Sequence, residues 1–258
     1  MNATILIGIM SAMPQEAALI QDKIENQETF QIGTREFIKG TFEGVPVVFT
    51  LAGVGKVSAA ATTALLISKF PIHEIIFTGV AGGGGDTSIG DIVVGSSYLQ
   101  HDLDLRPVFS QFHIFSLNTQ LIYARPDLVN RMKAAAGRFL KHGISFPALG
   151  IVDPKVHDGV IVSGDQFVGN STHHEKIAES TRELLPDGFH AIEMEGAAVA
   201  QVCQEMQVPF VVVRAISDKA NHDAGVKFQS FMDEVAGNYS LGVLKEYFRN
   251  PLSFSGDD

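Results

Sequence analysis

Cysteine is nearly absent from this sequence, since Cys203 is the one thiol among 258 residues. An intrachain disulfide is therefore impossible, and a single thiolate cannot hold a zinc cluster. Nothing in the cysteine usage points to an oxidising compartment. Cys203 ends an apolar helical run over 197–203, so we expect it to lie in the core.

Basic charge and long apolar runs are also scarce. Nineteen Lys and Arg residues against 29 Asp and Glu give a formal net charge of −10. Nucleic-acid backbones and anionic membranes attract basic faces, so neither is expected as a partner. No segment approaches the ~18 apolar residues of a membrane span. The apolar N-terminal stretch has no basic residue before Lys23, unlike a signal peptide, and a cytoplasmic location is the default expectation.

Short runs rich in Val and Ile alternate with helical patterns, and hydrophobic residues make up 45% of the chain, enough for a sizeable core. We expect strands at 4–10, 74–78, 91–98, 159–163 and 209–216, and a hairpin over 29–51 that turns at Glu43-Gly44. We expect helices from Pro14 and over 56–69, 127–141, 173–184 and 228–248, with 191–207 passing from a strand end into a helix. Continuous apolar strands between helices predict a single α/β domain over 1–258, a three-layer αβα sandwich around a central mixed sheet, with a frayed tail at about 253–258.

The segment 100–122 shows no clear periodicity and is rich in aromatic residues, with Phe109, Phe112 and Phe115. Long loops without secondary structure of their own are usually lids, binding loops or disordered segments. We expect a loop of one of these kinds at 100–122.

Three carboxylates follow expected strands, at the edge where open α/β sheets bind ligands: Glu16, Glu195 and Asp218. Taken alone, Glu16 is better explained as a partner of a helix dipole and Asp218 as a cap. Glu195 is harder to explain this way, because it lies between Met194 and a Gly-Ala-Ala helix start with apolar surroundings. A buried carboxylate needs a partner or a function, and the three together favour a functional site.

Two glycine-rich segments invite other interpretations. The segment 53–58 follows a strand and opens a helix, but Ser58 stands where a dinucleotide fingerprint needs Gly or Ala, and the next strand ends without an acid for a ribose. It is no P-loop either, since Thr50 replaces the first glycine and Val57 follows the lysine. The run 79–85 is either a tight turn or a cradle for an anion or a sugar oxygen. The nine histidines show no metal-site spacing.

Seven short strings occur in order: SAMPQE (11–16), GVGKV (53–57), TGVAGG (78–83), GDIVV (90–94), SGDQF (163–167), EME (193–195) and RAISD (214–218). Each is weak alone, but the ordered set spans nearly the whole chain. It resembles the 5′-methylthioadenosine/S-adenosylhomocysteine nucleosidases of the purine nucleoside phosphorylase superfamily. The resemblance implies a nucleoside phosphorylase-like fold, a homodimer, a small adenine nucleoside as substrate, and hydrolysis to adenine and a 5′-thioribose without metal or organic cofactor.

By this resemblance Glu16 would position and deprotonate the attacking water, Asp218 would protonate N7 of adenine, and Glu195 would bind the ribose hydroxyls. Six further residues would contact the substrate: Val54, Val80, Phe167, Val168, Met194 and Phe228. Of these, Phe167 would stack on adenine, and Phe228 would line the pocket for the 5′ substituent.

The resemblance has rivals on the same fold. Phosphorylases carry an arginine where Phe77 stands, and basic residues instead of an acid in the loop that holds Glu16; both differences favour water over phosphate. Val80 replaces a serine common in the family, and 101–121 departs from its better-known members. The 5′ preference therefore stays open, and a futalosine-type or other adenine nucleoside is an alternative substrate. A nucleoside-binding sensor and a dehydrogenase are more remote alternatives.

Overall fold

Strand β5 (Ile72–Gly83) is the central strand of the sheet. It pairs in parallel with β1 (Leu6–Ser11) and β10 (Phe210–Asp218), and antiparallel with β9 (Ala191–Glu193). Almost all of its residues are buried. A strand covered on both faces is a continuous apolar run instead of an alternating one, and this explains why its sequence carries no period of two.

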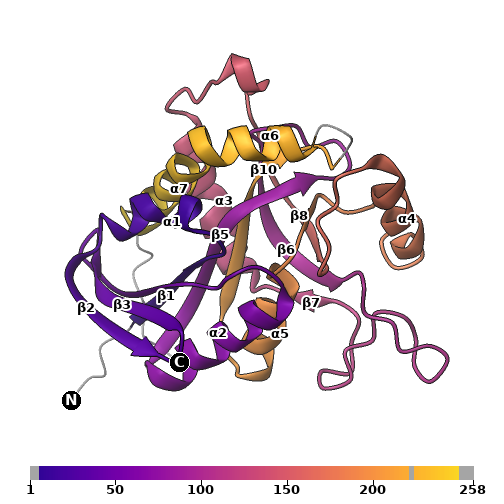
Figure 1. The fold of residues 1–258 in the computed structure, drawn as a ribbon, viewed down its shortest axis with the longest axis horizontal. Helices are drawn as coiled ribbons and strands as arrows, with labels where there is room; N and C mark the ends of the chain where they lie inside the picture. The colour runs from indigo at the N-terminus through magenta and orange to yellow at the C-terminus, as the bar shows by residue number, and fades with distance from the viewer. Residues whose placement is uncertain (1–5, 221–223, 250–258) are drawn as a thin grey trace.

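The computed structural model describes residues 6–220 and 224–249, arranged as Figure 1 shows. The remaining strands are β2 (Glu25–Ile32), β3 (Arg35–Phe42), β4 (Val45–Leu51), β6 (Ile92–Gln100), β7 (Ile122–Tyr123) and β8 (Val156–Ser163). The helices are α1 (Pro14–Gln21), α2 (Lys56–Lys69), α3 (Pro126–Leu140), α4 (Ser171–Thr181), α5 (Gly196–Glu205), α6 (Ala224–Phe231) and α7 (Gly237–Arg249), with short turns η1 (Pro147–Leu149) and η2 (Met232–Ala236). The sheet combines parallel and antiparallel pairs, so the predicted α/β class with a central mixed sheet is confirmed.

The sheet closes on itself on one side of β5. Strand β10 pairs with β6, β6 with β8 and β8 with β9, while β9 and β10 both pair with β5, so these five strands form a ring. On the other side the sheet continues through β1, β4, β3 and β2. The ring lies outside what the sequence predicts, because periodicity marks which face of a strand is covered and not which strand lies beside it.

Two groups of helices cover the sheet. Helix α2 packs against α5, while α1 and α3 both pack against α7. Figure 1 shows α2 and α5 on one side of the sheet and α1, α3 and α7 on the other. The expected three layers are therefore present.

The N-terminal hairpin is a three-stranded meander. Strands β3 and β4 pair across the expected turn, where Glu43 and Gly44 have φ angles of 48° and 77°. Two such residues in succession are typical of a type I′ turn. Strand β2 adds a third strand through a second turn at Gly33, so the prediction of a single hairpin over 29–51 is wrong in this respect. The physical reason is that β2 is a mostly exposed edge strand without apolar alternation.

The glycine run 79–85 begins as strand and not as a turn, because β5 continues to Gly83. Neighbouring segments approach it closely. A Cβ on Gly83 would lie 2.7 Å from the hydroxyl of Thr87, and a Cβ on Gly84 would lie 2.4 Å from the backbone oxygen of Phe189. Only glycine allows this approach, which brings β5, β9 and β10 together where the ring closes.

The last expected helix, 228–248, is longer and less regular than predicted. Helix α6 begins at Ala224, the π-helical turn η2 follows, and α7 ends at Arg249. A single π-turn widens the helix locally but leaves the apolar stripe close to the α-helical pattern. The frayed tail expected at 253–258, like the start of the first expected strand, lies outside the described residues.

Residues 101–121 form a loop with neither helix nor strand, as expected. Phe112 is buried and anchors the loop to the fold, whereas Phe115 is 70% exposed and Phe109 is 39% exposed. The loop therefore presents part of its aromatic surface outward.

Cys203 is fully buried in α5, which confirms its expected place in the core, and burial raises the pKa of its thiol. A thiol of this kind holds little thiolate at neutral pH and acts as a packing residue. No helix in the described part of the chain is long and apolar enough to cross a membrane.

Gly84→Ala is expected to lower the free energy of unfolding by about 1–3 kcal/mol, because the backbone oxygen of Phe189 cannot move aside for the new methyl group. The matched control is Gly137→Ala in α3, where nothing lies within 4 Å of the added Cβ. Alanine favours helix over glycine, so this control should gain about 0.5–1 kcal/mol. Urea unfolding measures both values, and effects of equal sign would contradict the close approach at Gly84.

Candidate active site

A cavity of about 350 Å³ opens beyond the carboxyl ends of β1, β5, β9 and β10, the edge where ligands bind in open α/β sheets. All the residues that the motifs and the resemblance place at a site line it: Glu16, Val54, Val80, Phe167, Val168, Met194, Glu195, Asp218 and Phe228. Further lining residues, to which the sequence gives no role, include Ala12, Met13, Gln166, Ile192 and Glu193. One cavity therefore brings the predicted set together, while the role of each residue stays a prediction.

Glu16 lies in the first turn of α1 and is 2% exposed. One carboxylate oxygen accepts hydrogen bonds from the backbone N–H groups of Ala12 (3.0 Å) and Met13 (2.8 Å), and the other accepts from the N–H of Val80 (3.0 Å). Burial raises the pKa of Glu16, while the positive charge of Arg214 and these three donors oppose the rise. Because donors serve both oxygens, the contacts suit the ionised carboxylate.

Asp218 is the last residue of β10 and is 2% exposed. Its Oδ1 accepts from the N–H of Ala220 at 2.7 Å, and its Oδ2 lies 2.8 Å from the Ser217 hydroxyl, which is also 3.2 Å from the carbonyl oxygen of Ala81. Burial raises the pKa of Asp218 against these hydrogen bonds. Since a hydroxyl has one proton, a protonated Asp218 can donate to Ser217 while Ser217 donates to Ala81. The site therefore accommodates the acid form of Asp218.

Glu195 occupies the N-cap position of α5, without a capping hydrogen bond from its side chain, and is 6% exposed. Its Oε1 accepts a hydrogen bond from the N–H of Gly55, at the start of α2, at 2.8 Å. Burial, followed by the negative charge of Glu193, raises the pKa of Glu195 to about 8. The pKa of this carboxyl therefore lies close to neutral pH, so small changes in its surroundings can change its protonation state.

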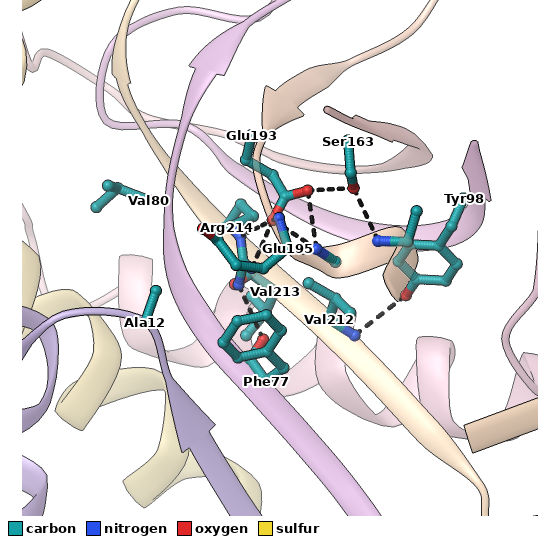
Figure 2. Close-up of polar contacts among 12 residues, drawn as sticks. Ala12, Phe77, Val80, Tyr98, Ser163, Glu193, Glu195, Val212, Val213 and Arg214 are labelled. Carbon is teal, nitrogen blue, oxygen red and sulfur yellow. Dashed lines mark hydrogen bonds and ion pairs between the residues drawn. The ribbon is translucent and has the colours of Figure 1, made fainter. Parts of the chain in front are cut away.

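Arg214 of β10 and Glu193 of β9 form a buried ion pair next to these three carboxyls. The guanidinium donates to Glu193 Oε2 at 2.7 Å, and the two side chains are 1% and 3% exposed. The guanidinium also donates to the backbone oxygen of Phe77 and lies over its ring, 4.2 Å from the centroid. Figure 2 shows this pair between β5 and β9, while the side chains of Ala12 and Val80 lie on the other side of β5.

Glu193 also organises the start of α5. Its carboxylate accepts from the N–H groups of Glu195 (3.1 Å) and Gly196 (2.8 Å) and from the hydroxyl of Ser163, which itself accepts from the N–H of Ala197 at 2.8 Å. Free N–H groups at a helix start need such acceptors. The network thereby fixes the direction in which Glu195 leaves the helix (Figure 2).

The sequence gives no role to Glu193 or Arg214, although both belong to recognised strings. A signal was available, because Arg214 interrupts the otherwise apolar strand 209–216. A buried arginine requires an acidic partner, and only the fold shows which acid that is.

The remaining wall of the cavity is apolar. The rings of Phe167 and Phe228 meet edge to face, with centroids 5.5 Å apart. Val168 is buried beside them, while Phe167 and Val54 are 50% and 53% exposed. An aromatic ring half open to solvent offers a face on which a planar ligand can stack.

The charged or ionisable side chains among the described lining residues of the cavity are all carboxyls. Its lining holds four carboxyls, Glu16, Glu193, Glu195 and Asp218, and no Lys or Arg among the described lining residues. Of the cations near the cavity, Arg214 is already paired with Glu193, and the charge of Lys227 acts on Asp218. Phosphate recognition needs arginine or lysine, so the site suits a reacting group that becomes positive far better than an anionic co-substrate.

Comparison with known proteins shows the family of the chain. The model of the phosphorylase superfamily matches residues 6–249. A 5′-methylthioadenosine/S-adenosylhomocysteine nucleosidase of Shewanella frigidimarina is 39% identical over 92% of this chain and 96% of its own length. The corresponding nucleosidase of Neisseria meningitidis, solved with methylthio-immucillin-A, has a TM-score of 0.81 and 33% identity over 94% of this chain and 97% of that one.

A futalosine hydrolase of Helicobacter pylori is almost equally similar in structure. Its TM-score is 0.81, with 31% identity over 95% of this chain and 98% of that one. The chain belongs to the phosphorylase superfamily and, within it, to the family of 5′-methylthioadenosine/S-adenosylhomocysteine nucleosidases.

Glu195→Gln is expected to raise the free energy of unfolding at about pH 9 and to change it little at about pH 4. The unfolded carboxyl titrates near its usual value of 4.5 and the folded one near 8, so stability from protonated Glu195 is lost as pH rises between these values. Glutamine cannot ionise and escapes this loss, which is about 1.4 kcal/mol per pKa unit. Chemical denaturation at both pH values measures the difference, and an equal change at both would contradict the raised pKa.

Proposed function

We propose that this protein hydrolyses the N-glycosidic bond of 5′-methylthioadenosine and S-adenosylhomocysteine, releasing adenine and a 5′-thioribose. The observation that carries the proposal is a cavity whose described lining residues include four carboxyls and no Lys or Arg, with Glu16 and Asp218 held in different environments. Such a site favours water over phosphate as the nucleophile, and it favours positive charge on the ribose. We further propose a cytoplasmic role in methionine salvage, which rests on the sequence and the family alone.

Asp218 is the proposed general acid. Adenine is a poor leaving anion, so a proton delivered to N7 lowers the barrier, and positioned proton transfer typically contributes about 10²–10⁴-fold. The burial that raises the pKa of Asp218 keeps a proton available at higher pH than an exposed aspartate would. The hydroxyl of Ser217 supports the protonated form before transfer and the carboxylate after it.

Glu16 is the proposed base that positions and deprotonates the water. Three backbone N–H groups hold its carboxylate rigidly in the cavity. The burial that raises its pKa also makes the carboxylate a stronger base than an exposed glutamate. Acid and base roles are thus separated by surroundings and not by residue type, as in other paired-carboxyl enzymes.

Glu195 is the proposed ribose contact. As the glycosidic bond breaks, the sugar becomes oxocarbenium-like, and a nearby carboxylate stabilises this positive charge. With a pKa of about 8, Glu195 ionises more readily once such a charge develops beside it. The proposed contacts with the base are stacking on Phe167 and the backbone of Val168, while Met194 packs on the sugar.

The 5′ substituent is expected to meet the apolar part of the wall, with Met13, Val54, Val80 and Phe228 as the lining residues. An apolar wall suits a thioether. A futalosine-type nucleoside is the second candidate substrate, supported by the similarity to the futalosine hydrolase of Helicobacter pylori.

The test is adenine release from 5′-methylthioadenosine in phosphate-free buffer, followed by chromatography. We expect release without phosphate and no increase when phosphate is added, because no Lys or Arg stands among the described residues that line the cavity. Asp218→Asn should lower kcat at least about 10²-fold while the circular dichroism spectrum stays unchanged.

Each alternative gives a different result. Adenine release only with phosphate would identify a phosphorylase. No adenine release under either condition, together with turnover of a futalosine-type nucleoside, would favour the second candidate. Near-wild-type turnover by Asp218→Asn would remove Asp218 as the acid.

We also propose a homodimer whose contact includes the aromatic loop. Phe109 and Phe115 meet edge to face with centroids 5.3 Å apart, and Phe109 stacks on His113 at 5.2 Å. These rings form an aromatic cluster next to Val108, which is 77% exposed. Exposed apolar clusters of this kind often mark contacts between proteins.

Light scattering should therefore give twice the chain mass for the native protein, and Phe115→Ser combined with Val108→Ser should shift the mass toward one chain. Lys133→Ser, on α3, removes an exposed pair with Asp158 and serves as the control that leaves the mass unchanged. A fully active native monomer would rule out this contact.

A further inference from the structure

Three charged residues form a closed ring of hydrogen bonds next to the cavity, and none of them lines it. The ammonium of Lys56 donates to Asp102 Oδ1 at 2.5 Å. The backbone N–H of Lys56 donates to Asp165 Oδ1 at 2.7 Å, and the backbone N–H of Asp165 donates to Asp102 Oδ2 at 2.9 Å. The ring ties together the start of α2, the loop after β6 and the loop after β8.

Two of the three tied segments, the start of α2 and the loop after β8, continue directly into the cavity wall. Lys56 follows Gly55, whose N–H donates to Glu195 at 2.8 Å, the one hydrogen bond found for that carboxylate in the described residues. Asp165 precedes the wall segment 166–168. The ring therefore links the side of the cavity that holds Glu195 to the side that carries the aromatic wall.

Local helix propensity does not explain Lys56. It is the first residue of α2, where the helix dipole disfavours a cation. Here Asp165 supplies the acceptor that a helix start needs, and Asp102 neutralises the lysine. A residue that violates a local preference and is compensated by two distant acids is typical of a site under functional constraint.

The ring lies toward solvent, but it is held at more points than a simple surface ion pair. The side chains of Lys56 and Asp102 are 16% and 33% exposed. Asp102 is partly buried, which alone would raise its pKa, yet the hydrogen bonds from Lys56 and the Asp165 amide hold the pKa below its usual value. The ammonium has a further acceptor in Gln100 at 3.1 Å. Fully exposed pairs contribute little, whereas this one is held at several points.

We propose that Lys56, Asp102 and Asp165 act as positioning residues. The ring of hydrogen bonds among them holds the Gly55 amide in contact with the Glu195 carboxylate, and this contact sets the affinity of the site for a ribose-bearing ligand. The binding arm of its test rests on the proposed function, because the ligand is an adenine nucleoside. The ring acts through Glu195 and touches no reacting atom.

The first arm is a double-mutant cycle in an Asp218→Asn background, which blocks turnover so that calorimetry can measure the Kd of 5′-methylthioadenosine. Lys56→Met should raise this Kd about 10-fold where Glu195 is present and less than about 3-fold in Glu195→Gln, because coupled residues are not additive. Lys56→Arg keeps donors for Asp102 and should bind within about 3-fold of the parent. Equal losses in both backgrounds, or no rescue by arginine, would overturn the proposal.

The second arm needs no ligand. Withdrawal of the Gly55 amide removes a contact that lowers the pKa of Glu195, so Lys56→Met should move the carboxyl titration seen by carbon-13 NMR to higher pH. The other charged groups that act on Glu195, namely Glu193, Arg214 and Glu16, stay in place.

Asp104→Asn, in the same loop but paired only with the exposed Arg106, is the matched control and should change neither readout. If the titration of Glu195 is unchanged in Lys56→Met, the positioning role proposed for the ring is wrong, whichever substrate the protein hydrolyses. A wild-type protein that releases no adenine, with the titration shifted as expected, rejects the proposed function and leaves the ring intact.

Discussion

Arg214 and Glu193 are paired where almost no water reaches them, at 1% and 3% exposure, and the cavity is organised around that pair. The cost of burying two charges is recovered only when geometry and further hydrogen bonds are good. Both partners meet this condition: the guanidinium reaches a backbone oxygen and an aromatic face, and the carboxylate reaches two backbone amides and a hydroxyl. Through those bonds Glu193 directs Glu195, while the charge of Arg214 acts on Glu16. One buried pair thus sets the position of one carboxyl and the electrostatics of another.

The fixed pair allows carboxyls in one cavity to differ chemically. Glu16 is surrounded by N–H donors, which suit an anion. Asp218 faces the Ser217 hydroxyl, which can accept a hydrogen bond from the protonated carboxyl while it donates its own hydrogen bond to the Ala81 carbonyl. Glu195 has a single amide and a negative neighbour, and its pKa rises to about 8. Residue type alone does not separate these roles, since the surroundings set which protonation state each carboxyl favours.

Some of this follows from the sequence and some does not. Glu16, Glu195 and Asp218 could be found because strand ends are visible in apolar runs. The parallel strands β1, β5 and β10 bring Glu16 and Asp218 to one edge, whereas Glu195 follows β9, which is antiparallel to β5. Glu193 could not be found, because its partner lies in another strand and nothing local specifies the pairing. The same limit hides the ring of five strands and the edge strand β2, whose exposed residues carry no burial pattern. Local signals therefore identify elements and side chains, while neighbours in space require the fold.

The glycine run after the apolar part of β5 joins these points. The sequence allows two interpretations, a tight turn or a cradle for an anion, and the structure gives the amide a specific anion: the N–H of Val80 donates to the carboxylate of Glu16. A Cβ on Gly79 would lie 2.8 Å from Glu16 Oε1 and 3.3 Å from the guanidinium of Arg214. A side chain at Gly79 would therefore separate the carboxylate from the amide that holds it and disturb the buried pair behind it. Glycine at position 79 leaves the space in which the Glu16 carboxylate of α1 reaches the Val80 amide of β5. The position of the Glu16 side chain therefore depends on the absence of a side chain at Gly79.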